Sequence, residues 1–133
     1  MKGSLTIAML SLIAISCNTP QQTEEKPLMD QVMEVHDAVM PKMGELMKTK
    51  KALIAKAESL SNVDSLQIEK LKALAEEIDL ANEAMMDWMH NFDPNFEASE
   101  DEVKDYLTKK RQGIEKVAEA MNDKLEAGKK ALE

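Results

Sequence analysis

Thioether and imidazole side chains are the groups with the most distinctive chemistry in this sequence. The 133 residues include eleven methionines and two histidines. Eight of the methionines fall into two clusters, namely Met29, Met33, Met40, Met43 and Met47, and Met85, Met86 and Met89. Thioether sulfur and imidazole nitrogen favour soft cations such as Cu(I), and Ag(I) shares this preference. The two clusters therefore raise the hypothesis of a soft-metal site.

The spacing of the histidines supports that hypothesis. Met33 and His36 have M-x-x-H spacing, which resembles the motif of periplasmic silver- and copper-binding proteins, and His90 follows Met86 by four residues. Both spacings put sulfur and nitrogen on one face of a helix. The nearby Trp88 could cover a bound ion by a cation–π contact. The candidate ligands are Met33, His36, Met40, Met86, Met89 and His90.

Two other interpretations of the methionines stay open. Methionine fills irregular cores and contacts aromatic rings through sulfur, and we favour this interpretation because a stripe at helical spacing is more often core. Alternatively, the methionine-rich end opens near Pro41 and presents an apolar groove to a partner protein. The core interpretation predicts buried methionines, whereas the groove interpretation predicts exposed ones.

Enzymatic and nucleic-acid-binding functions are disfavoured. The sequence contains no nucleotide loop, zinc finger, calcium loop or nucleophile elbow. His36 and Asp37 do not form a catalytic dyad on sequence grounds, because neighbours in a helix point about 100° apart. The formal net charge of −8 argues against nucleic acid as a partner, since binding phosphates requires basic side chains. We therefore expect a binding or structural module and not an enzyme.

The elements that must position these residues are helices. Charged residues make up 32% of the chain and aromatic residues only 3%, which is typical of amphipathic helices. Apolar residues at intervals of three and four predict helices over about 28–60, 65–91 and 100–132. Pro41 predicts a kink or short break in the first of these. Asp64 and the pair Ser99 and Glu102 provide N-terminal caps for the other two.

Three such helices predict an all-α domain over residues 28–133, an antiparallel three-helix bundle resembling a coiled coil, with a kink near Pro41. A long dimeric coiled coil is the alternative. In a hairpin that turns near residue 62, residue n lies opposite about residue 123 − n. Met33 and His36 then face the segment 86–90, and Trp88 belongs to the same end, as do Phe92, Val103 and Tyr106. Asn82 takes an apolar position in the second helix, where a polar group fixes register.

The N-terminal segment predicts the location of the protein. Lys2 precedes an apolar run over residues 5–16, which is too short to span a membrane and is typical of a signal peptide. Residues 14–17 (AISC) resemble a bacterial lipobox, so we expect residues 1–16 to be removed and Cys17 to carry acyl chains such as palmitate. Residues 17–27 form a lipidated cysteine and flexible tether. Asn18 in place of aspartate favours the outer membrane of a Gram-negative cell envelope, with the leaflet open.

Two segments carry a family resemblance. Residues 33–44 (MEVHDAVMPKMG) and 87–92 (DWMHNF) resemble a family of short Bacteroidota lipoproteins often labelled viral A-type inclusion proteins. The resemblance extends over most of residues 17–133. It implies a lipid-anchored helical protein and brings no assigned activity, cofactor or catalytic residue.

Overall fold

The computed structural model describes residues 26–60 and 64–133, and these residues fold into four helices. The helices are α1 (Leu28–Val39), α2 (Lys42–Ser59), α3 (Ser65–His90) and α4 (Glu100–Leu132). The described ranges contain no strand, which confirms the all-α class. Cys17, the signal peptide at 1–16 and most of the tether lie outside the described residues, so those expectations stay predictions.

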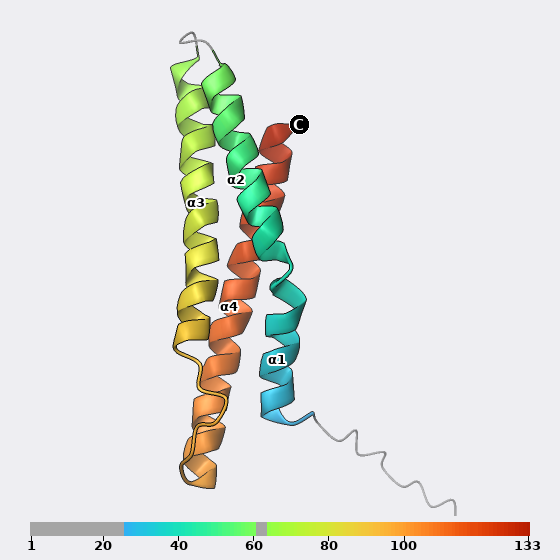
Figure 1. Ribbon diagram of the computed structural model, residues 1–133, viewed down its shortest axis with the longest axis vertical. Helices are drawn as coiled ribbons and strands as arrows, with labels where there is room; N and C mark the ends of the chain where they lie inside the picture. The colour runs from blue at the N-terminus through green and yellow to red at the C-terminus, as the bar shows by residue number, and fades with distance from the viewer. Residues whose placement is uncertain (1–25, 61–63) are drawn as a thin grey trace, which may run out of the picture.

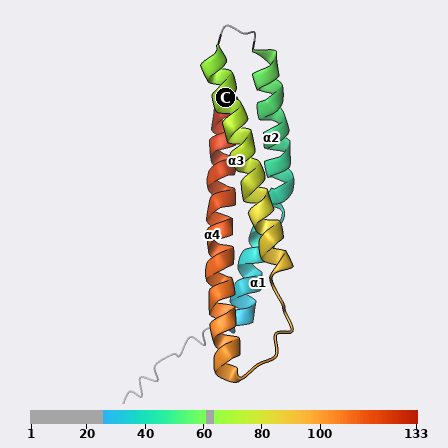
Figure 2. The ribbon, with the colours of Figure 1, turned by 90° about the vertical axis from the view of Figure 1, so that its left-hand side faces the viewer.

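The helices pack together along a common long axis. In Figures 1 and 2, α2 and α3 lie side by side with α4 next to them. Contacts between elements join α2 with α3, α3 with α4, and both α1 and α2 with α4. The α1 segment lies beside α4 at the end where residues 91–99 connect α3 to α4 (Figure 1). Helix α4 thus contacts each of the others.

The first predicted helix is interrupted at Met40 and Pro41, as its proline indicates. Both residues keep helical backbone angles, with φ and ψ of −51° and −44° at Met40 and −60° and −25° at Pro41. Proline has no amide hydrogen to donate to the carbonyl four residues earlier, which belongs to Asp37. The Met43 amide instead donates to the Met40 carbonyl at 3.2 Å. The predicted break is confirmed, and the segment 28–60 forms α1 and α2 (Figure 1).

The other helices begin where their capping residues indicate. The Asp64 carboxylate accepts a hydrogen bond from the Gln67 amide at 3.1 Å, directly before α3. The Glu102 carboxylate accepts from both the Ser99 amide at 3.1 Å and the Ser99 hydroxyl at 2.6 Å, which forms the capping box of α4. The observed bounds of α3 and α4 agree with the predicted ranges to within one residue.

The core consists of apolar side chains from every helix. The largest fully buried side chains are Val32, Leu46, Leu53, Leu71, Ile78, Met85, Ile114 and Met121. Burying one such side chain contributes roughly 1.5–3 kcal/mol, so this seam supplies the main driving force for packing. No helix of the described residues is both long enough and apolar enough to cross a membrane.

Candidate functional site

All the aromatic residues of the chain lie in one stack at one end of the molecule. The sequence has one Trp, one Tyr and two Phe. The ring centroids of Trp88 and Phe92 are 4.8 Å apart, those of Phe92 and Tyr106 are 6.3 Å apart, and those of Tyr106 and Phe96 are 4.3 Å apart. We call Trp88, Phe92, Tyr106 and Phe96 the aromatic ladder. It joins the end of α3, the 91–99 connection and the start of α4.

Trp88 is fixed in this ladder by α4. Its indole Nε1 donates a hydrogen bond to the Lys110 carbonyl at 3.1 Å. One turn further along α4, a Cβ atom added at Gly113 would lie 3.3 Å from Trp88 Cδ1, so the glycine leaves the space that the indole occupies. The edge of the indole that carries Nε1 is therefore held against the main chain of α4.

The connection between α3 and α4 is tied to the same ladder. The Tyr106 hydroxyl accepts a hydrogen bond from the Asp93 amide at 2.6 Å. The Lys110 ammonium donates to the Asn91 carbonyl and lies 5.3 Å from the centre of the Tyr106 ring. These contacts hold the end of α3 and the following connection against the first turns of α4.

His36 extends the stack onto α1 and meets Met89. Its ring lies 5.8 Å from the Trp88 ring, with 29° between the ring planes. His36 Nε2 lies 3.4 Å from Met89 Sδ, and His36 Nδ1 lies 2.9 Å from Asp37 Oδ1. The His36 side chain is only 17% exposed. The hairpin arithmetic, which places residue 36 opposite about residue 87, correctly brings this histidine to the second methionine cluster.

One argument from the sequence is wrong here. Adjacent residues of a helix point apart at Cβ, which led us to separate His36 from Asp37. In the structure the Asp37 carboxylate nevertheless reaches Nδ1 of its neighbour. The reason is that a flexible side chain can fold along the helix surface, so the direction of the Cα–Cβ bond alone does not decide the contact.

The hydrogen-bonding capacities of these three groups have a chemical consequence. An ionised carboxylate accepts hydrogen bonds and cannot donate them, so we infer that His36 Nδ1 carries the ring proton toward Asp37. In the neutral ring Nε2 is then a bare lone pair. The Met89 thioether also has no hydrogen to donate. Two lone-pair donors thus face each other at 3.4 Å, an arrangement that a proton or a soft cation between them would stabilise.

The remaining candidate ligands divide into two groups. Met33 and Met40 are half-buried, and they precede and follow His36 by three and four residues on the same face of α1. Met86 is 45% exposed, and His90 is also exposed. The structure therefore brings His36 and Met89 together and leaves Met86 and His90 in solvent.

The methionines as a whole are neither a buried stripe nor an exposed one. Met85 and Met121 are fully buried in the core. Six others are half-buried, namely Met29, Met33, Met40, Met43, Met47 and Met89. Both interpretations of the sequence thus describe part of the set. We call Met33, Met40, Met43 and Met47, which follow one face of α1 and α2, the methionine strip.

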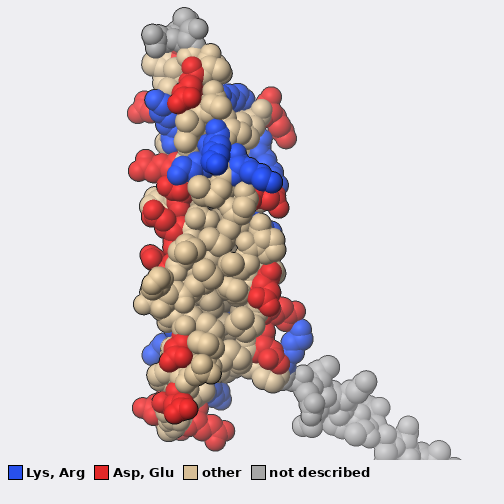
Figure 3. All heavy atoms as spheres, viewed as in Figure 1, with Lys and Arg blue, Asp and Glu red and all other residues tan. Residues whose placement is uncertain are grey.

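The methionine-rich end carries an extended uncharged surface. Figure 3 shows an area without Lys, Arg, Asp or Glu over the half of the molecule where Figure 1 places α1 and the second half of α3. In the same view, charged side chains gather toward both ends and along the edges, so the uncharged area lies between them (Figure 3). The uncharged area covers the elements that carry the His36–Met89 pair.

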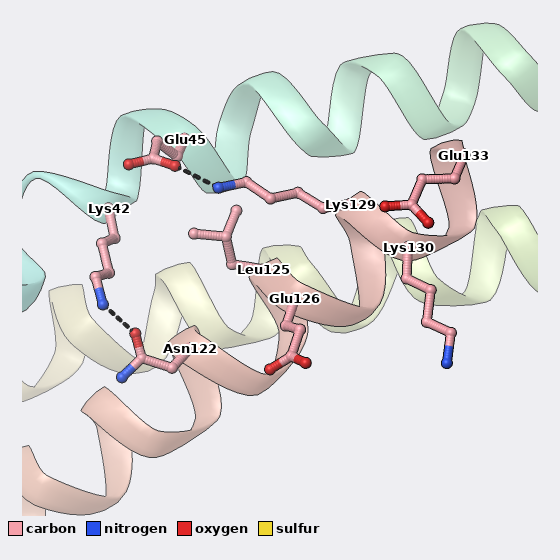
Figure 4. A pocket seen from close by; sticks show the side chains of 8 residues that line it. All are labelled: Lys42, Glu45, Asn122, Leu125, Glu126, Lys129, Lys130 and Glu133. Carbon is pink, nitrogen blue, oxygen red and sulfur yellow. Dashed lines mark hydrogen bonds and ion pairs between the residues drawn. The ribbon is translucent and has the colours of Figure 1, made fainter.

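A groove in the other half of the molecule is lined mainly by charged side chains. This groove of about 620 Å³ lies between the start of α2 and the end of α4 (Figure 4). In it Lys129 donates to Glu45 at 2.8 Å and Lys42 donates to Asn122. The hydrogen bond from Lys129 is the main reason that the pKa of Glu45 lies below its ordinary value. The Lys129–Glu45 and Lys42–Asn122 bonds join α2 and α4 across the groove.

Acidic, histidine and cysteine side chains do not form a metal cluster in the part of the chain that the structure describes. Sequence reasoning missed Phe96 and Lys110 as partners of Tyr106. The one available signal was that Phe96 is among only four aromatic residues in the chain.

Comparisons with protein-family models, curated proteins and solved structures found no match.

Proposed function

We propose that this protein is a lipid-anchored lipoprotein of a Gram-negative cell envelope whose helical domain acts as a binding module and not as an enzyme. The lipobox-like residues 14–17 and the apolar run before them support the anchor. Acyl chains on Cys17 would attach the domain to the outer membrane without a spanning helix. The ten residues after Cys17 would serve as the tether.

We further propose that the domain is an antiparallel three-helix bundle within one chain. Contacts between the α1–α2 segment and α3 support this proposal. His36 contacts Met89 and Lys50 contacts Asp79, so residue numbers rise along one segment as they fall along the other. In the contacts of the α1–α2 segment with α4, residue numbers rise along both segments, since Gln31 contacts Arg111 and Glu45 contacts Lys129. Helices α1 and α2 would then run parallel to α4, with α3 opposite in direction.

Zero-length carboxyl–amine cross-linking tests that topology. Lys50 and Asp79 are 2.6 Å apart and Lys124 and Glu77 are 2.7 Å apart, so both pairs should form links. Mixing isotope-labelled and unlabelled chains before cross-linking separates the two arrangements. Links within single chains support the bundle, and links between labelled and unlabelled chains would favour the dimeric coiled coil.

The uncharged surface over α1 and α3 is the observation that carries the binding role. Charged residues make up 32% of the chain, yet they are missing from this area (Figure 3). Large exposed apolar patches mark contact sites for other molecules, and we take the uncharged area as a candidate for one. Half-buried methionines at such a surface adapt their shape to a partner at little conformational cost.

Mass spectrometry of the protein from the envelope fraction tests the anchor. We expect loss of residues 1–16 and an added acyl mass on the new N-terminal Cys17. The Cys17→Ser variant should lose the acyl mass and keep residues 1–16. A wild-type protein that keeps residues 1–16 and carries no lipid would contradict the proposal.

Photo-cross-linking in cells tests the binding role. A photoreactive residue at Met33, on α1 and in the methionine strip, should give one discrete adduct. The control is Leu66, which is 62% exposed near the start of α3 and lies away from the strip. Adducts that appear equally at both positions, or at neither, would argue against the uncharged surface as the binding site.

A further inference from the structure

The contact between His36 and Met89 provides two soft donor atoms at one point of the surface. Nε2 and Sδ come from helices α1 and α3, 53 positions apart in the sequence, and lie 3.4 Å apart. Thioether and imidazole donors together select monovalent soft ions over Mg²⁺ or Ca²⁺, which require oxygen ligands. The donor types therefore limit the class of ion.

The separation of the two atoms fits a single ion between them. Metal ions bind imidazole nitrogen at about 2.0 Å and sulfur at about 2.3 Å, with zinc as the reference. An ion at those distances from atoms 3.4 Å apart makes a nitrogen–metal–sulfur angle of about 104°. That angle is close to the tetrahedral value, so both atoms can ligate without a change in their separation.

Asp37 prepares the imidazole for this role. Ligating histidines commonly donate their second ring N–H to a carboxylate, which fixes the tautomer and raises the basicity of the ligating nitrogen. The Asp37 carboxylate lies 2.9 Å from Nδ1, on the side of the ring away from Met89. The lone pair of Nε2 is thereby directed at the sulfur.

We propose that His36 Nε2 and Met89 Sδ, completed by a thioether of Met33 or Met40, bind one Cu(I) or Ag(I) ion. This proposal rests on the proposed binding role of the uncharged surface and names its ligand class. Met33 and Met40 flank His36 on one face of α1 and are half-buried, so each has room to turn its sulfur toward the ion. The Trp88 ring, 5.8 Å from His36, forms the wall of the site.

Titration with Ag(I), followed by tryptophan fluorescence, tests the site. Trp88 is the chain's single tryptophan, so its emission reports on this end alone. The protein is the full chain of 133 residues in detergent with Cys17→Ser, which removes the competing thiol. We expect saturable quenching at one equivalent. His36→Gln and Met89→Leu should each weaken the apparent affinity at least tenfold.

The exposed pair supplies matched controls. Met86→Leu and His90→Gln change the same residue types on α3 and should alter the affinity by less than twofold. Circular dichroism melts identify any variant that fails to fold. In the folded wild type, the ¹⁵N resonance of His36 Nε2 should shift on addition of Ag(I), independently of any variant.

The outcomes separate this proposal from the broader one. If the wild type shows no saturable quenching and no Nε2 shift, or if the controls weaken binding as much as His36→Gln, the metal site is wrong. A discrete adduct at Met33 alongside a negative silver titration would leave the binding surface standing with a protein as its ligand. If neither the silver titration nor the photo-cross-linking gives the expected result, both proposals are wrong.

Discussion

Gly128 packs so closely against Thr49 that a larger side chain at position 128 would collide with it. A Cβ atom at position 128 would lie 2.5 Å from Thr49 Cγ2 and 2.9 Å from Ile78 Cδ1. The glycine on α4 therefore sets how closely α4 approaches both α2 and α3. Glycine weakens a helix, but at this position near the end of α4 the close packing leaves no room for a larger side chain.

Gly128→Ala should destabilise the fold despite the better helix propensity of alanine. The added methyl group forces α4 away from its neighbours, and overpacking of this kind costs about 1–3 kcal/mol. Urea denaturation measures the loss. Gly44→Ala is the control, because nothing lies within 4 Å of its added Cβ, and it should gain about 0.5–1 kcal/mol. Equal effects of the two substitutions would disprove the packing role of Gly128.

Pro41→Ala should stabilise the protein by about 1–2 kcal/mol. Pro41 is exposed and already has helical backbone angles, so alanine can adopt its conformation and donate the missing hydrogen bond to the Asp37 carbonyl. Thermal and urea unfolding both report the change. A decrease in stability would mean that the break between α1 and α2 contributes packing that a continuous helix loses.

Tyr106→Phe should loosen the connection between α3 and α4 while leaving the aromatic ladder stacked. The substitution removes the hydroxyl that accepts from the Asp93 amide, and such a bond is worth about 0.5–1.5 kcal/mol. Hydrogen exchange is the most direct measurement, with faster exchange expected at the Asp93 amide. Unchanged exchange there would show that the bond does not order the connection.

Asn82→Leu should raise the stability of the fold. The Asn82 side-chain oxygen is buried and has no hydrogen-bond partner among the described residues. Removing an unsatisfied buried polar atom gains about 1–3 kcal/mol. If Asn82 fixes the register, the more stable variant should also form additional oligomers in sedimentation experiments. A less stable, monomeric variant would contradict both expectations.

Glu102 should make the start of α4 sensitive to acid. Hydrogen bonds from the Ser99 hydroxyl and amide lower the pKa of this carboxyl below its ordinary value. Its contribution to stability is therefore present above the pKa of the unfolded chain, about 4.3, and is lost as the pH falls through the lower folded pKa. Ser99→Ala should raise the Glu102 pKa in a carboxyl ¹³C NMR titration. An unchanged pKa would exclude the hydroxyl as its cause.

The sequence predicts the helices well because their signals are local. Capping residues such as Asp64 and Ser99 and the break at Pro41 act within one or two turns, so the bounds follow from neighbouring residues. The meeting of His36 with Met89 was also predictable, because a hairpin of known turning point fixes which residues lie opposite.

The side-chain details of the site depend on longer-range packing. The spacing of Met86 and His90 shows that they share a face of α3, but it does not say that this face turns to solvent. Phe96 stacks on Tyr106 through the path of an irregular connection, which no periodic pattern describes. The contact of Asp37 with His36 depends on a rotamer choice.

The aromatic ladder makes the two ends of the molecule optically different. Near-ultraviolet absorption and emission arise at the end that contains Trp88 and Tyr106, whereas far-ultraviolet circular dichroism reports helix along the whole length. An unfolding curve measured by emission therefore follows one end, and a curve measured by helicity follows both. Coinciding midpoints would show that the protein unfolds as one cooperative unit. Separate midpoints would show that the end with the α2–α3 connection melts on its own.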